Sequence, residues 1–332
     1  NVSGTTTITL ASGATINVDA SEITNMLAHK TSGRLIFGDQ QITVTGAITV
    51  DNANLLGETT RGIVTATIAT TETMTELATL TADGGTNAFR VVISSDDATT
   101  CTAEQLNTIN DVTSVAVDLT NVTALAESSL DDLGTLATAI TNNEFSNAIY
   151  LTTIAVTDTA IDATTLATII ESFDTINVSG TTTITLASGA TINVDASEIT
   201  NMLAHKTSGR LIFGDQQITV TGAITVDNAN LLGETTRGIV TATIATTETM
   251  TELATLTADG GTNAFRVVIS SDDATTCTAE QLNTINATTS VAVDLTNVTA
   301  LANNSLADLG TLATDITNNE FSNAIYLTTI AV

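Results

Sequence analysis

The sequence predicts an α/β solenoid, built from right-handed, parallel β-helix-like coils of about 29 residues, each with short strands and a short capped helix. Three observations predict this fold. The segment 1–156 recurs at 177–332 with six differences in 156 positions. Within the 176-residue offset, short segments rich in Ile, Val and Thr begin six times, roughly 26 to 34 residues apart. Start signals for short helices stand between these segments.

The expected strands are short, β-branched and alternating in polarity. They begin the six units at 176–178, 35–37, 63–68, 89–93, 115–119 and 149–151. Thr-rich alternation at 5–10 and 41–45 predicts a second strand in those units. Parallel pairing with right-handed crossovers is the arrangement that strands joined by helical stretches favour.

The expected helices follow the strands. Thr102 and Gln105 stand three positions apart, as in a capping box, ahead of Leu106 and Ile109. Similar signals precede apolar stripes at Asp19, Thr73, Asp162 and Ser129, and the helix after Ser129 is expected to be the longest. The helix at 51–57 has the weakest signal, because Gly57 interrupts it early. Helices this short need tertiary packing, so stacked units must bury their apolar stripes.

The alternative fold is a row of tandem β-sandwich domains, about two in each copy. Helix signals in at least five of the six units argue against it. We therefore expect residues 1–176 to form the first copy, with about six coils, and residues 177–332 to form a second, near-identical and truncated copy. The side chains expected in the core include Leu106, Ile109, Val117, Leu133 and Ile169.

Composition and charge exclude several classes of protein. Hydrophobic residues make up 42% and charged residues 13%, which is not the composition of a charge-rich disordered chain. No apolar run approaches the length of a membrane span. Eight basic against 36 acidic residues give a net charge of −28, which disfavours a nucleic-acid backbone or an anionic membrane as partner and leaves cations as natural small partners. Two cysteines cannot form a disulfide framework.

Three segments carry a resemblance to a known class of protein. They are 102–110, 115–123 and 162–170, with the sequences TAEQLNTIN, VAVDLTNVT and DATTLATII. With them the chain resembles the giant tandem-repeat cell-surface proteins of aquatic bacteria, in which Thr-, Ala- and Asp-rich segments of this type lie between short Val/Thr strands. The likeness covers most of the chain. It implies an extracellular structural, adhesive or motility-related role, with no active site to carry over.

Paired acidic residues are the candidate metal ligands. Asp96 and Asp97, with their counterparts Asp272 and Asp273, fall near an expected helix start, where carboxylates cap backbone N–H groups without any metal. Stacked coils could also bring carboxylates together and supply the six to eight oxygens of a calcium site. The Gly-Gly-x-Gly-x-Asp calcium repeat of many secreted proteins is absent, so calcium is not carried over from them. Both interpretations, capping and calcium, stay open here.

The other chemically interesting residues favour structural roles. His29 and His205 follow a predicted helix, whose C-terminal carbonyls a basic side chain complements. One His per copy provides no cluster with metal-ligand spacing. Cys101 and Cys277 stand directly before predicted helix caps, as small corner residues. Because no nucleophile–base motif or phosphate-binding loop occurs, we expect no catalytic activity and no organic cofactor.

The sequence therefore predicts a structural tandem-repeat protein of an extracellular fibre, surface layer or adhesin stalk at the cell surface. The alternative is a repeat module that binds glycans or ice along a Thr-rich strand face, with cell-surface polysaccharide as its partner. Neither end looks like a polar cap, since Asn1 and Val332 both fall within expected strands. We therefore expect further copies, or self-association end to end along a fibre, because an uncapped solenoid exposes unpaired strand groups.

Overall fold

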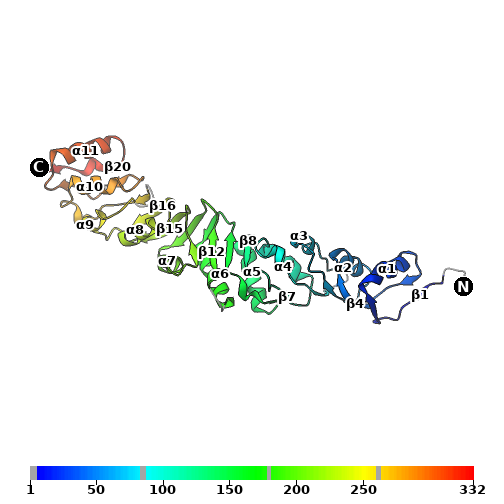
Figure 1. Ribbon diagram of the computed structural model, residues 1–332. Coiled ribbons are helices and arrows are strands. Elements are labelled where there is room, and N and C mark those ends of the chain that lie inside the picture. The colour runs from blue at the N-terminus through cyan, green and yellow to red at the C-terminus, as the bar shows by residue number, and fades with distance from the viewer. Residues whose placement is uncertain (1–5, 83–86, 178–180, 259–262) are drawn as a thin grey trace. The chain divides into compact units, whose positions relative to one another are not determined.

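The computed structural model describes residues 6–82, 87–177, 181–258 and 263–332 (Figure 1). The chain is a mixed α/β protein with parallel sheets. Its contacts divide it into two compact units. Unit 1 comprises Asn1–Thr157 and Ile169–Ile184, and unit 2 comprises Asp158–Thr168 and Thr185–Val332.

The largest sheet of unit 1 is parallel, with strand order β2-β4-β5-β6. Its strands are β2 (Thr15–Asp19), β4 (Gln41–Ile48), β5 (Val64–Ile68) and β6 (Ala88–Arg90). The register pairs residues of the same type on neighbouring strands, since Ile16 of β2 lies beside Ile42 of β4 and Val18 lies beside Val44. Ile42 is completely buried, Val18 and Val44 are 9% exposed and Ile16 is partly buried, whereas alternate residues such as Asn17 face outward. Alternation of period two therefore places one face of the sheet in the core.

Shorter parallel ladders continue the pattern along unit 1. They pair β1 (Ile8–Thr9) with β3 (Leu35–Ile36), β7 (Val117–Asp118) with β9 (Phe145–Ser146), and β8 (Ala124–Ser128) with β10 (Thr153–Val156). Isolated parallel bridges join Asn87 to Thr113 and Val92 to Asp118. Each segment thus pairs with the segment that follows the next helix.

Six α-helices lie in the described part of the first copy. They are α1 (Ile23–Thr31), α2 (Val50–Gly57), α3 (Met74–Leu77), α4 (Ala103–Asp111), α5 (Leu130–Thr141) and α6 (Ala163–Ile176). Short 3₁₀ turns stand at η1 (Ala20–Glu22), η2 (Ser95–Asp97) and η3 (Ala148–Tyr150). The predicted capping boxes at Thr73 and Thr102 are both present, and Thr49 caps α2 through the N–H of Asn52.

Unit 2 has the same kind of structure. Its main sheet is parallel, with order β11-β13-β15-β16-β17, and the smaller ladders are β18-β20 and β19-β21. These strands are β11 (Ala160–Asp162), β13 (Thr191–Asp195), β15 (Gln217–Ile224), β16 (Val240–Ile244), β17 (Ala264–Arg266), β18 (Val293–Asp294), β19 (Ala300–Leu301), β20 (Phe321–Ser322) and β21 (Thr329–Ile330). The helices are α7 (Ile199–Thr207), α8 (Val226–Gly233), α9 (Met250–Leu253), α10 (Ala279–Asn286) and α11 (Leu306–Thr317). The 3₁₀ turns are η4 (Ala196–Glu198), η5 (Ser271–Asp273) and η6 (Ala324–Tyr326), and the remaining strands are β12 (Thr183–Leu186) and β14 (Leu211–Ile212).

The predicted core is confirmed in detail. Leu106, Ile109, Val117 and Leu133 are completely buried, and Ile169 is 5% exposed. Their burial shows that the helix stripes were assigned to the correct face.

Three expectations about individual elements are wrong. Residues 149–151 do not begin a strand, because Asn147 adopts a left-handed conformation (φ 61°) and starts η3, so the strand begins only at Thr153. Ile176 is the last residue of α6 rather than the start of a strand, and Val178 lies outside the described residues. The longest helix is α6, with 14 residues, whereas α5 after Ser129 has 12.

Candidate functional site

The carboxyl group of Asp97 is engaged with the helix of the preceding segment. Asp96 and Asp97 form the 3₁₀ turn η2, where the Ser94 hydroxyl accepts a hydrogen bond from the Asp96 N–H (3.2 Å). Asp97 Oδ2 accepts a hydrogen bond from the N–H of Met74, the first residue of α3 (3.2 Å). The second copy repeats this arrangement, with Asp272 in the turn and Asp273 accepting from Met250 N–H (3.2 Å).

This arrangement agrees with capping for Asp97 and Asp273, but the helix that each caps belongs to the preceding segment and is not, as was expected, the helix that starts after the acidic pair. A carboxylate at the first turn of a helix satisfies an N–H that has no partner within the helix, and it interacts favourably with the helix dipole. Among the described residues, no group of three or more His, Cys, Asp or Glu side chains is arranged to hold a metal ion. A calcium site at Asp96 and Asp97 would need several further oxygens from main chain or solvent, and it stays a prediction.

The contact between Asp97 and Met74 belongs to a series. The first N–H of α2, at Val50, donates to Glu72 Oε2 (3.0 Å), and the first N–H of α4, at Ala103, donates to Ser128 Oγ (3.0 Å). The partners lie 22 to 25 residues apart in sequence. Each of these helices thus has two caps, because its own Thr caps the third residue and the next segment caps the first. We call this series the inter-segment caps.

A natural difference between the copies preserves one inter-segment cap. Ser128 is replaced by Asn304 in the second copy. The Asn304 side chain still accepts from the first N–H of α10, at Ala279 (2.7 Å). Sequence reasoning missed these caps; their only signal is an acceptor about one segment after each helix start.

The cysteines and histidines show no reactive arrangement. Cys101 and Cys277 are completely buried, and each thiol lies 3.8 Å from a backbone carbonyl oxygen that it approaches as a donor. Burial raises the pKa of the Cys101 thiol to about 12 and that of Cys277 to about 11, so neither forms the nucleophilic thiolate at neutral pH. His29 and His205 lie in the last turns of α1 and α7, as expected for residues that complement a helix C-terminus.

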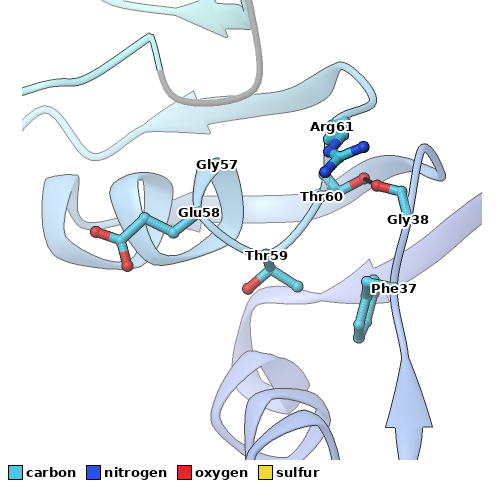
Figure 2. A pocket seen from close by; sticks show the side chains of 7 residues that line it. All are labelled: Phe37, Gly38, Gly57, Glu58, Thr59, Thr60 and Arg61. Carbon is cyan, nitrogen blue, oxygen red and sulfur yellow. Dashed lines mark hydrogen bonds between the residues drawn. The ribbon is translucent and has the colours of Figure 1, made fainter.

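A polar cavity of about 620 Å³ opens between two loops of unit 1 (Figure 2). One loop follows β3 and supplies Phe37 and Gly38, and the other follows α2. The lining consists of Phe37, Gly38, Gly57, Glu58, Thr59, Thr60 and Arg61. Figure 2 shows Phe37 and Arg61 on the same side of Thr59, with the Glu58 carboxyl group directed the other way. Phe37 is half-buried and Arg61 is exposed.

Buried polar side chains fix the two loops against each other. The amide of Gln40, 3% exposed, accepts from Gly38 N–H and donates to the carbonyl oxygen of Ala11 (3.0 Å). The Thr60 hydroxyl, 4% exposed as a residue, donates to the backbone carbonyl of Gln40. A side chain at Gly62 would collide with this same carbonyl, so only glycine allows the approach. Because buried polar groups are costly unless paired, this network holds the loops in one conformation.

The second copy has the same loop network. Gln216 bonds with Gly214 N–H and the Ala187 carbonyl, Thr236 bonds with the Gln216 carbonyl, and Gly238 makes the close approach. The guanidinium of Arg237 lies beside Gly214, and its charge contributes to lowering the pKa of Asp215, after hydrogen bonds from Ser188 and Gly189.

Comparison of the sequence with models of known protein families and with curated proteins finds no match. Of the helices in the described parts of the chain, none combines the length and the apolar character needed to cross a membrane.

Chemically, the cavity has the properties of a binding site. Its titratable lining groups are a carboxylate, Glu58, and a guanidinium, Arg61. The carboxyl group is directed away from the arginine, and the neighbouring hydroxyls belong to threonines whose hydrogen bonds serve the loops. An aromatic wall, a cation and fixed hydroxyl groups can recognise a ligand without reacting with it.

Proposed function

We propose that this chain is a structural tandem-repeat protein of an extracellular fibre, surface layer or adhesin stalk, with a solenoid fold and no catalytic activity. One observation carries the proposal. In the main sheet of each unit, equivalent residues of successive segments stand side by side in parallel. The inter-segment caps tie α2, α3 and α4 to the segments that follow them, and α8, α9 and α10 repeat this. Such an array is stabilised by contacts between neighbouring segments, so it can be lengthened by adding copies.

The acidic composition fits the same role. With a net charge of −28, neighbouring chains repel one another unless specific contacts or cations intervene. Self-association along a fibre therefore needs ordered contacts between chains rather than nonspecific attraction. The location that we propose is the cell surface or the extracellular space, which is also what the resemblance to giant repeat proteins implies.

Imaging decides the functional part of the proposal. Antibodies raised against the chain should label the outside of intact cells that produce it, in filaments or a continuous layer, by immunogold electron microscopy. Labelling confined to the cell interior, or soluble protein without higher-order material, would contradict the structural role.

Engineered disulfides test the parallel stacking of strands on which the proposed solenoid fold rests. Asn17 and Thr43 are paired in parallel on the outward face of β2 and β4. Cysteines at both positions should form an intramolecular disulfide, since neighbouring strands have the Cα spacing that a disulfide requires. A matched control places cysteines at Asn17 and Thr65, one strand further away, where no bond should form. Cross-linking in the control but not in the test variant would refute the parallel register.

A further inference from the structure

Two adjoining cavities of unit 1 concentrate the chain's scarce positive charge. The cavity at Phe37 and Arg61 shares Glu58 and Thr59 with a second cavity of about 430 Å³, which lies between α1 and α2. The second cavity is lined by Thr24, Leu27, Lys30, Thr31, Asn52, Leu55, Glu58 and Thr59. Together their linings contain two basic residues and one acidic residue, in a chain with 8 basic and 36 acidic residues.

The two basic groups are presented differently. The Lys30 ammonium donates to Thr59 Oγ1 (3.0 Å) and approaches the carbonyl oxygen of Glu58 (3.4 Å), which places it at the wall that the cavities share. The guanidinium of Arg61, within the described residues, makes no hydrogen bond, although the Arg61 backbone N–H is bound to Gly38 O (2.7 Å). The backbone of Arg61 is therefore fixed, while its guanidinium group remains available to bind a carboxylate with two parallel hydrogen bonds.

Phe37 adds an apolar wall to the same cavity as Arg61. Its ring is half-buried and lines the first cavity on the side of the Thr59 methyl group, whereas the Thr59 hydroxyl is turned away from it (Figure 2). An aromatic ring and a cation in the lining of one cavity suit a sugar ring that carries a carboxylate, because C–H groups of the sugar pack on the aromatic ring while its carboxylate binds the cation. The second cavity, with Lys30 and Asn52, offers a place for the next sugar of the same polymer.

We infer that these adjoining cavities form a binding groove for an acidic polysaccharide whose sugars carry carboxylate groups, held by the local pair Lys30 and Arg61 against the general repulsion from a chain with a net charge of −28. Arg61 binds one carboxylate, Phe37 packs against that sugar, and Lys30 attracts the neighbouring unit. The buried Gln40 and Thr60 network orders the loops before binding, so little conformational entropy is lost on association. The same loop network recurs at Gln216 and Thr236, and Phe213 and Arg237 stand at the equivalent positions of the second copy.

This inference goes beyond the structural role and does not depend on it. A fibre or surface layer that binds an acidic polysaccharide would be held to the cell coat at regular intervals.

The test uses the full chain and a defined probe, an oligomer of six α-linked galacturonate units, with its methyl-esterified form as the uncharged match. Calorimetry should show binding of the acidic oligomer and at least about tenfold weaker binding of the ester, since the carboxylate contact is lost. The double variant Arg61→Ala/Arg237→Ala should weaken binding of the acidic oligomer about tenfold or more. The charge-matched control Arg90→Ala/Arg266→Ala should bind as the unmodified chain does.

Two further measurements separate a sugar site from a general basic patch. Phe37→Leu/Phe213→Leu should weaken binding of the oligomer with an unchanged melting temperature, and poly-glutamate of equal charge should bind much more weakly than the oligomer. The inference is overturned if the acidic oligomer does not bind, if the ester binds equally well, if the Arg90/Arg266 variant loses as much affinity, or if poly-glutamate binds as tightly. None of these results bears on the disulfide and imaging tests, so the two proposals fail separately.

Discussion

The carboxyl group of Asp97 accepts a hydrogen bond from the backbone N–H of Met74 at 3.2 Å, although 23 residues separate them. The helix that Met74 begins, α3, has only four residues, Met74–Leu77. A helix this short has few internal hydrogen bonds, so its caps decide whether it forms. Asp97 therefore acts on the stability of the segment before its own.

Replacement of Asp97 by Ala should destabilise α3 in particular. The lost cap should cost about 0.5–2 kcal/mol. Hydrogen exchange followed by mass spectrometry should show faster exchange in 73–80, with a much smaller change in 95–101, where the substitution lies. Asp96→Ala is the matched control, because its side chain has no part in this cap, and it should leave exchange of α3 unchanged. Equal effects of the two substitutions would contradict the inter-segment cap.

The hydrogen bonds of these acidic pairs also lead to a prediction about calcium binding. If Asp96, Asp97, Asp272 and Asp273 serve as caps and turns, EGTA should leave the melting temperature unchanged, and added calcium should shift it no more than magnesium does. A fall of several degrees with EGTA that calcium alone reverses would establish a structural calcium site, since a ligand bound only to the folded state raises its stability.

Ser128 allows a sharper test of the caps, because the second copy already contains the conservative variant. Ser128→Asn should leave the stability of α4 nearly unchanged, since Asn304 makes the equivalent bond at 2.7 Å. Ser128→Ala should cost about 1–3 kcal/mol, because the Ala103 N–H is buried and would lose its partner. Urea denaturation of the three chains provides the comparison. A loss in the Asn variant as large as in the Ala variant would show that packing, not the hydrogen bond, matters here.

Local signals predicted the parts of the fold that are governed locally. The capping boxes at Thr73 and Thr102 and the buried positions Leu106 and Leu133 follow from residues within one or two helical turns. The strand predicted for residues 149–151 was wrong because it too was inferred from a local pattern alone. Their alternation is typical of a strand, yet the left-handed Asn147 before them redirects the chain. Alternation of apolar and polar residues carries no information on the backbone conformation of the turn that precedes them.

The candidate site could not be predicted from local sequence patterns, because it depends on contacts between segments that are far apart in the sequence. The cavity exists because Gly62 lets the loop at 60–62 approach the Gln40 carbonyl, and the bond between Asp97 and Met74 exists because segments of unequal length come into register. In the main sheet of unit 1, successive partners are offset by 26 residues at Thr15, 22 at Ile42 and 23 at Thr65. The sequence predicts a mean spacing of about 29, which is too coarse to align individual side chains.

Core packing makes a prediction of its own. Leu106→Ala should cost about 2–5 kcal/mol, since Leu106 is completely buried and the substitution leaves a cavity. Leu282→Ala, its counterpart in the second copy, is also completely buried and should cost a similar amount. Leu55→Ala, at a position 46% exposed, should change stability by much less. Chemical denaturation checks all three, and a negligible effect of Leu106→Ala would contradict the assigned helix face.

Acid should weaken the hydrogen bonds made by carboxylates. The Ser12 hydroxyl and then the Gly13 N–H hold the pKa of Asp39 below its usual value of 3.8, and Ser188 and Gly189 do the same for Asp215. A carboxyl group whose pKa is lower in the folded than in the unfolded chain stabilises the fold above the unfolded pKa. That contribution is lost as pH falls below about 4 and through the folded pKa.

The overall charge acts in the opposite direction, because protonation relieves the repulsion among 36 acidic residues. The relief of repulsion in acid affects the unmodified chain and a variant alike, so it cancels when the stabilities of the two are compared at each pH. Asp39→Asn/Asp215→Asn removes the two carboxylates and keeps side chains of similar shape. The unmodified chain should be more stable than this variant at pH 7, and the difference should shrink toward zero between about pH 4 and pH 2. Urea midpoints measured at pH 7, 5, 4, 3 and 2 provide the test. A difference that stays constant, or grows in acid, would show that these carboxylates do not stabilise the fold through their charged form.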